Sequence, residues 1–190
     1  MWWLEPGKRT AARALTRFAA VSLMGGLLAG CFQPLYADKT ATGAPTMKAA
    51  LAQVDVSQIP AANGSPESRI AVELRNNLMF GLTGGAGSLP PTHRLDIKIV
   101  PTRLSIIVDI QSARPDVENF GLNAYYTLID LKTGKPVLTD TTFSRVSYDI
   151  PGQEQRFARA RGLRDAENRA AKVIAESIQS RLASYFLAKT

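Results

Sequence analysis

One histidine and one cysteine narrow the chemistry open to this chain of 190 residues. His93 is the sole histidine and Cys31 the sole cysteine, so a Ser-His-Asp or Cys-His arrangement would have to use one of them. No nucleophile-elbow pattern lies near His93, which follows Pro90-Pro91 at the start of an extended segment. Protein zinc sites take several cysteine, histidine or carboxylate ligands. We therefore predict no catalytic residue, no metal site and no cofactor, and we interpret His93 as a surface histidine.

The carboxylates are the second group that could do chemistry. General acid or base catalysis needs a carboxyl group held within hydrogen-bond reach of the reacting proton. Four candidates lie on polar strand faces or at strand ends: Asp96, Asp109, Asp130 and Asp149. The alternative to catalysis is that they are ordinary surface residues in contact with solvent. Because the sequence brings no two of them together, we predict that they are surface residues.

Four arginines fall within nine residues ahead of the C-terminal apolar stripe: Arg156, Arg159, Arg161 and Arg164. The planar guanidinium matches phosphate oxygens in pairs, so such a cluster could bind phosphate groups. The alternative is a solvated helix face, or pairing with Glu154 and Asp165. We favour this second interpretation.

The net charge of +7 overstates how basic the protein is. Of the 23 basic and 16 acidic residues, four basic and one acidic precede Cys31, and without them the net charge is +4. Nucleic-acid binding usually needs cations gathered on one face together with stacking aromatics. We therefore predict no nucleic-acid partner, whereas anionic lipid headgroups remain possible ligands.

The N-terminus has the pattern of a secretory signal peptide. Four cations precede an apolar run of 11 residues, Phe18–Leu28, which is shorter than the roughly 20 residues that cross a bilayer. The run ends in Leu28-Ala29-Gly30-Cys31, which resembles the bacterial lipobox. The alternative is an ordinary signal peptide followed by a stray cysteine. We predict cleavage before Cys31 and lipid on that cysteine, which gives a signal peptide over 1–30, a lipidated tether over 31–50 and one domain over 51–190.

The order of helices and strands sets the expected fold. Alternation of apolar residues predicts a strand over Leu51–Ile59, and Ser65-Pro66-Glu67 begins a helix that we expect to end at Gly81. A strand begins at Arg94, and the apolar phase changes from odd to even numbers after Pro101, which predicts a kink there.

A hairpin and a long helix complete the domain. Alternating apolar residues over 120–128 and 137–149 surround a short loop with Gly134, which predicts a β-hairpin. Steps of three and four predict a helix over Gln153–Ala188, with Ile174 and Ile178 on its apolar stripe and a possible division at Gly162. The predicted fold is α+β: an antiparallel-rich four-stranded sheet with two helices packed on one face, in the order β-α-β-β-β-α.

The segment Cys31-Phe32-Gln33-Pro34-Leu35-Tyr36 resembles the opening of alphaproteobacterial members of the lipopolysaccharide (LPS)-assembly lipoprotein family, which are LptE-like. The order of elements is also similar to that family. The resemblance implies a non-enzymatic lipoprotein of the cell outer membrane, on its periplasmic side. Such a protein plugs and helps assemble a large β-barrel, the LPS translocon, and assists LPS insertion into the outer leaflet.

The resemblance also implies partners and contacts. The partners would be the outer-membrane β-barrel, LPS and, through the lipid anchor, the membrane. From charge and presumed loop position, Lys132, Lys135 and Arg103 are the candidate LPS contacts. Two other classes of protein stay open: an auxiliary lipoprotein of an ABC-type lipid transporter, and a lipid-anchored envelope hydrolase.

Overall fold

The computed structural model describes residues 46–107, 115–150 and 156–188. All of them belong to the second of two units into which the chain divides, Asp38–Thr190. The predicted lipid-bearing residue, Cys31, and the candidate carboxylate Asp109 lie outside the described residues. The elements follow in this order: α2 (Met47–Ala52), β1 (Val54–Val56), α3 (Pro66–Thr83), β2 (His93–Ile107), β3 (Pro115–Asp130), β4 (Pro136–Asp149) and α4 (Arg156–Leu187).

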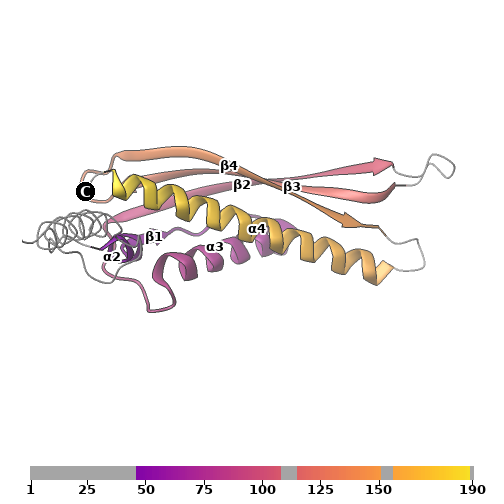
Figure 1. Cartoon of the computed structure of the whole chain (residues 1–190), viewed down its shortest axis with the longest axis horizontal. Coiled ribbons are helices and arrows are strands. Elements are labelled where there is room, and N and C mark those ends of the chain that lie inside the picture. The colour runs from indigo at the N-terminus through magenta and orange to yellow at the C-terminus, as the bar shows by residue number, and fades with distance from the viewer. Residues whose placement is uncertain (1–45, 108–114, 151–155, 189–190) are drawn as a thin grey trace, which may run out of the picture. The chain divides into compact units, whose positions relative to one another are not determined.

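One four-stranded sheet, in the order β1-β2-β3-β4, forms the frame of this unit. β1 is parallel to β2, whereas β2 with β3 and β3 with β4 are antiparallel, so the sheet is mixed rather than purely antiparallel. Both α3 and α4 lie on the same side of the sheet (Figure 1). The predicted α+β fold and its β-α-β-β-β-α order are therefore confirmed, with the short helix α2 added in front.

The start of the domain differs from its prediction. Leu51 and Ala52 were expected in a strand, but they end α2, which Thr46 caps by accepting a hydrogen bond from the Ala49 N–H at 3.2 Å. Only Val54–Val56 forms a strand, with both valines buried. A short helix and a strand can each turn an apolar side chain such as Leu51 toward the core. The apolar character of Leu51 therefore did not show which of the two it belongs to.

Helix α3 begins as predicted but ends later. Ser65 is its N-cap and accepts a hydrogen bond from the Ser68 N–H, and Pro66 takes the first helical position. The helix passes through Gly81, the expected end, and stops at Gly84, whose φ of 63° is left-handed. Gly81 has another use, because a Cβ there would lie 2.5 Å from Oε1 of Gln179 on α4. This glycine lets the two helices approach.

The kink predicted at Pro101 is wrong. Pro101 pairs with Leu122 in an unbroken ladder, and the one irregularity between β2 and β3 falls between Ile106 and Ile107. β1 pairs with β2 only as far as Leu95, so the rest of β2 is an edge of the sheet, where a proline can be accommodated. The odd-numbered residues of β2 face the helices, and the next two beyond Pro101, Arg103 and Ser105, are polar. The even-numbered Leu104 lies on the opposite face and is 66% exposed. The apolar residues therefore move from odd to even numbers although the pairing with β3 is unbroken at Pro101.

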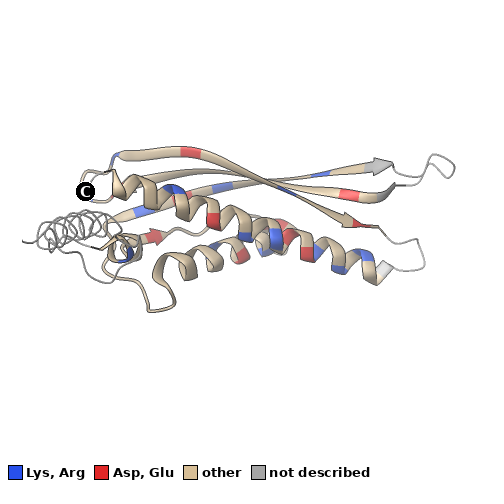
Figure 2. Ribbon diagram, viewed as in Figure 1, with Lys and Arg blue, Asp and Glu red and all other residues tan. Residues whose placement is uncertain are grey.

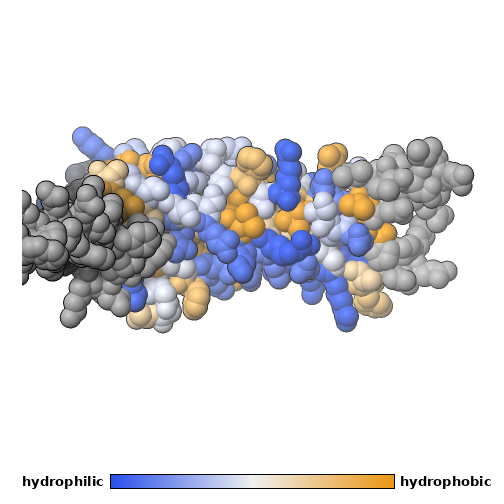
Figure 3. Space-filling view, in the orientation of Figure 1, coloured by the Kyte–Doolittle hydropathy of each residue, from blue (hydrophilic) through white to orange (hydrophobic). Residues whose placement is uncertain are grey.

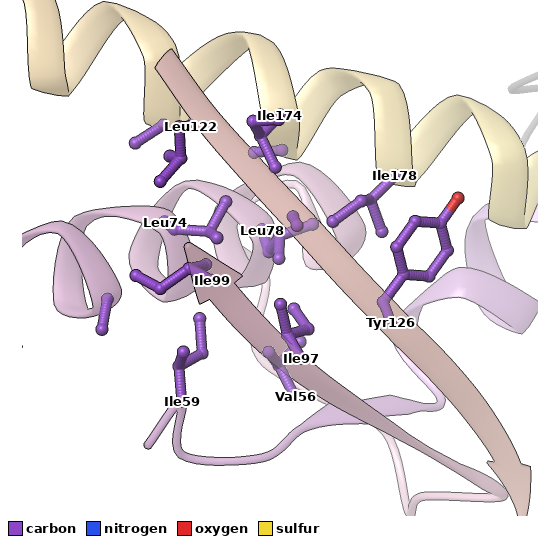
Figure 4. Packing of buried hydrophobic residues seen from close by; sticks show 14 of the residues in the cluster. Val56, Ile59, Leu74, Leu78, Ile97, Ile99, Leu122, Tyr126, Ile174 and Ile178 are labelled. Carbon is purple, nitrogen blue, oxygen red and sulfur yellow. The ribbon is translucent and has the colours of Figure 1, made fainter. Parts of the chain in front are cut away.

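Helix α4 runs unbroken past Gly162, so the division considered there does not occur. Two hydrogen bonds join α3 to α4: Arg69 to Asn168 near the start of α3, and Gln179 to the Gly81 carbonyl near its end. Because the residue numbers rise together along both helices, α3 and α4 are parallel. Between them and the sheet lies the hydrophobic core, in which Ile174 and Ile178 are completely buried and belong to the same cluster as Leu74 and Leu78 (Figure 4). The predicted apolar stripe of α4 is confirmed.

Candidate interaction surface

His93 lies at the start of β2 and is partly buried, not on open surface. Its ring stands edge-on to Phe186 of α4, with ring centroids 5.2 Å apart, and its Nδ1 is 2.9 Å from Oγ1 of Thr92. These contacts join the start of the sheet to the end of α4. They give His93 a packing role.

The three described candidate carboxylates, Asp96, Asp130 and Asp149, lie apart from one another. The first two have partners close by in the sequence, and the third lies at the end of a strand. Asp96 pairs with Arg94, with Oδ1 and Nε 3.1 Å apart. Asp130 accepts a hydrogen bond from the Lys132 N–H in the β3–β4 turn, and this bond is the main reason that its pKa lies below the ordinary value. Asp149 ends β4, opposite Val117. No described group of three or more His, Cys, Asp or Glu side chains is arranged to hold a metal ion.

A cluster that the sequence analysis missed lies beneath the first turns of α4. Glu118 on β3 is 92% buried and accepts hydrogen bonds from Tyr148 on β4 and from Ser105 on β2, while Nη2 of Arg159 lies 3.1 Å from its Oε1. Burial alone would raise the pKa of Glu118, but the bonds from Tyr148 and Ser105 and the charge of Arg159 outweigh it, so the pKa lies below its usual range. Burial and the same carboxylate raise the pKa of Tyr148 to about 12.

A second buried carboxylate, Glu167 on α4, is only 2% exposed and pairs with Arg69 of α3. Nη2 of Arg103 on β2 lies 3.7 Å from the other carboxylate oxygen. We call the Glu118 and Glu167 groups together the polar clasp. It joins α3, α4 and the three long strands where the apolar core ends, and charged residues of both signs interleave along this part of α4 (Figure 2).

The structure does not bring the three candidate LPS contacts together. Lys132 and Lys135 lie in the β3–β4 turn, beside the start of β2, since the Leu131 N–H bonds to the Thr92 carbonyl. Arg103 lies ten residues beyond His93, the first residue of β2, and ten residues of a strand span about 33 Å. It is in the strand and not in a loop, because β2 continues through Pro101, and its guanidinium belongs to the clasp.

The arginine cluster also divides. Arg159 is engaged with Glu118, whereas Arg161 and Arg164 are exposed. Asp165, one of the expected carboxylate partners, pairs with Arg169 one turn later, with N and O 2.7 Å apart. Glu154 and the side chain of Arg156 lie outside the described part of the structure. The three described guanidiniums do not converge on one phosphate site, because Arg159 is engaged by Glu118.

The face of the sheet opposite the helices exposes apolar side chains next to cations. Pairing of β2, β3 and β4 places on it two cations and four partly exposed apolar or aromatic residues: Lys98, Arg145, Val100, Leu104, Tyr125 and Phe143. We call these six residues the open face. A shallow groove of about 630 Å³ lies at one end of the open face, where Lys98 and Tyr125 line it together with the carboxylates Asp96 and Asp140. Such an exposed apolar group rimmed by polar residues is typical of an interaction surface.

Comparisons with known proteins find no matching family model and no matching curated protein. Among solved structures, a Caulobacter crescentus protein described as a lipoprotein has 23% identical residues and a TM-score of 0.58, over 76% of this chain and 97% of that one. The two proteins share a fold. A Xanthomonas campestris protein matches over 73% of this chain and 88% of its own, with 11% identity and a TM-score of 0.50. Rare lipoprotein B of Shewanella oneidensis matches at 12% identity and a TM-score of 0.49, over 72% of this chain and 96% of its own.

Within the described residues, no helix combines the length and the hydrophobicity needed to cross a membrane.

Proposed function

We propose that this chain is a lipoprotein of the outer membrane, cut before Cys31 and lipidated there, whose domain binds within a large outer-membrane β-barrel. In this role it helps the barrel to assemble and assists the insertion of LPS into the outer leaflet. The Lys132–Lys135 turn remains a candidate LPS contact, because both lysines are exposed at one end of the sheet. Arg103 is a weaker candidate, since Glu167 already engages it.

The observation that carries the proposal is the lipobox cysteine followed directly by Phe32-Gln33-Pro34-Leu35-Tyr36. The fold supports it, because a Caulobacter crescentus protein described as a lipoprotein has the same architecture over nearly all of its length. Phe32 after the cysteine, where an aspartate would favour retention in the inner membrane, supports the outer membrane as the destination.

The contacts of the ionisable groups support a binding role in preference to an enzymatic one. His93 packs on Phe186, and the two buried carboxylates, Glu118 and Glu167, are each held by arginine. These groups act as links between helices and strands. The Caulobacter crescentus protein that shares this fold is described as a lipoprotein, and its description names no enzymatic activity.

The test is purification of the tagged lipoprotein from detergent-solubilised outer membrane. We expect one large β-barrel to co-purify in defined stoichiometry, and depletion of the lipoprotein to lower the amount of correctly assembled barrel and to sensitise cells to large hydrophobic antibiotics. Normal barrel assembly and LPS export with disturbed phospholipid balance would instead support the ABC-transporter auxiliary.

His93→Ala is the matched control for the hydrolase alternative. A plug needs surface complementarity but no proton-transfer group, so the variant should keep partner binding and barrel assembly. If the folded variant bound its partner but lost all function, the non-enzymatic interpretation would be wrong.

A further inference from the structure

We propose that the open face of the sheet docks on a lipid surface with anionic headgroups, the membrane in which the chain is anchored. The inference rests on the lipid anchor of the proposed function, and it goes beyond the barrel role because it describes how the anchored domain lies when no partner holds it.

Strand pairing gathers the apolar residues of the open face into one patch. Val100 and Phe143 flank Asn123 in one row across the three strands, and Tyr125 follows two residues later on β3. Leu104 stands two strand positions beyond Thr102 on β2, and it and Phe143 are each 66% exposed. These side chains contribute nothing to the core on the other side of the sheet.

The two cations beside the patch are complementary to an anionic amphiphile. The same face also carries three carboxylates: Asp96 pairs with Arg94, and Asp55 and Asp149 lie toward opposite ends of the sheet. Lys98 lies directly opposite Tyr125, and the Arg145 guanidinium stands 5.7 Å from the ring centre of Phe143. No carboxylate of the described residues lies within salt-bridge distance of Lys98 or Arg145. Aromatic rings beside cations are typical of surfaces that enter the headgroup region, where each cation gains about a fivefold preference for anionic lipid.

A barrel lumen is a poorer match for this face. The interior of outer-membrane barrels is polar. The helix side also exposes apolar residues, among them Phe80 on α3 and Phe157 on α4, and apolar residues are interspersed with hydrophilic ones on the side seen in Figure 3. On the open face, strand pairing brings the apolar residues together. This patch would be left unsatisfied in a polar lumen, whereas it can enter lipid.

The length of chain ahead of the domain permits the docking. Fourteen residues separate Cys31 from Thr46, and they can span at most about 50 Å. Helix α2, which follows Thr46, lies beside the start of β2, since the Thr92 N–H bonds to the Gln53 carbonyl. Val100 is seven residues farther along the strand than His93, about 23 Å. A lipid on Cys31 would therefore keep the open face within reach of the bilayer.

The experiment uses the mature lipidated protein with a single tryptophan. Both native tryptophans, Trp2 and Trp3, precede Cys31, so cleavage leaves none. Phe143→Trp reports on the open face, and Phe80→Trp is its control, because Phe80 is similarly exposed (70%) but lies on α3. Each variant is reconstituted in phosphatidylethanolamine–phosphatidylglycerol vesicles with and without brominated acyl chains. The intact mass of the same preparation checks the lipid on Cys31, so a missing anchor and a failure to dock are told apart.

Bromine should quench Phe143→Trp strongly and Phe80→Trp little, because only the open face enters the upper 5 to 10 Å or so of the bilayer. Adding Lys98→Gln and Arg145→Gln should lower the docked-to-undocked ratio about fivefold per charge removed, and high salt should do the same. Equal quenching of the two tryptophans, or none at position 143, would overturn the proposal. Protection of position 143 from aqueous quenchers only after addition of the barrel partner would overturn it in favour of a protein occupant.

Discussion

Phe120 and Phe143 stand on neighbouring strands of one sheet and point in opposite directions. Phe120 on β3 is completely buried against the helices, whereas Phe143 on β4 is 66% exposed on the open face. One phenylalanine thus stabilises the core, whereas the other remains accessible at the surface. The comparison teaches that hydrophobicity alone does not separate core from contact surface, and that the side of the sheet on which the helices pack does.

The largest expected effect tests the covered side. Phe120→Ala should lower the free energy of unfolding by about 3 to 5 kcal/mol, because it removes a fully buried aromatic ring and leaves a cavity. Phe143→Ala should change it by less than about 0.5 kcal/mol. Chemical denaturation of both variants measures the difference, and similar losses would show that the open face is part of the core.

The helix layer gives a second contrast of the same kind. Ile174→Ala or Ile178→Ala should cost about 2 to 5 kcal/mol, since both side chains are completely buried. Lys172→Ala, on the exposed side of α4, should cost under about 0.5 kcal/mol. Equal losses in denaturant would contradict the orientation of α4.

A smaller effect separates the polar clasp from the apolar core. Glu118→Gln should cost about 1.5 kcal/mol at neutral pH, the low end for hydrogen bonds to a charged group, because Arg159 is half exposed. The folded pKa of Glu118 is depressed below 4.5, so its contribution is present above that value and is lost as the pH falls through the folded pKa. The difference in stability between wild type and variant should therefore shrink in acid, and a difference that grew in acid would exclude the clasp as described.

Local signals in the sequence predicted much of the fold. The Ser65-Pro66-Glu67 start of α3, the hairpin of β3 and β4 and the stripe of α4 each depend on neighbours a few residues away. The prediction of a kink at Pro101 was wrong because β1 is short and pairs with β2 only as far as Leu95. Pro101 therefore lies on an edge of the sheet, and the length of β1 cannot be read from the residues around Pro101. The end of α3 was wrong because Gly81 serves a contact with Gln179, 98 residues away.

The polar clasp was missed for a similar reason, although a signal for it exists. Glu118 is in phase with Phe120, Leu122 and Ala124, and Glu167 follows the buried Ala166. A carboxylate in an apolar phase indicates a buried partner, but the sequence does not say which of the 23 basic residues supplies it. Arg159 lies 41 residues from Glu118. The open face was visible only once the pairing of three strands was known.

The lipid on Cys31 is the claim on which the membrane and barrel roles both depend, and the intact mass of the mature protein from the membrane fraction tests it most directly. We predict a chain that begins at Cys31, with no residue before it, and a mass excess equal to the attached acyl groups. Cys31→Ala should incorporate no labelled fatty acid, because no other cysteine is present. A mature chain that begins elsewhere, or label that persists in the variant, would contradict the account.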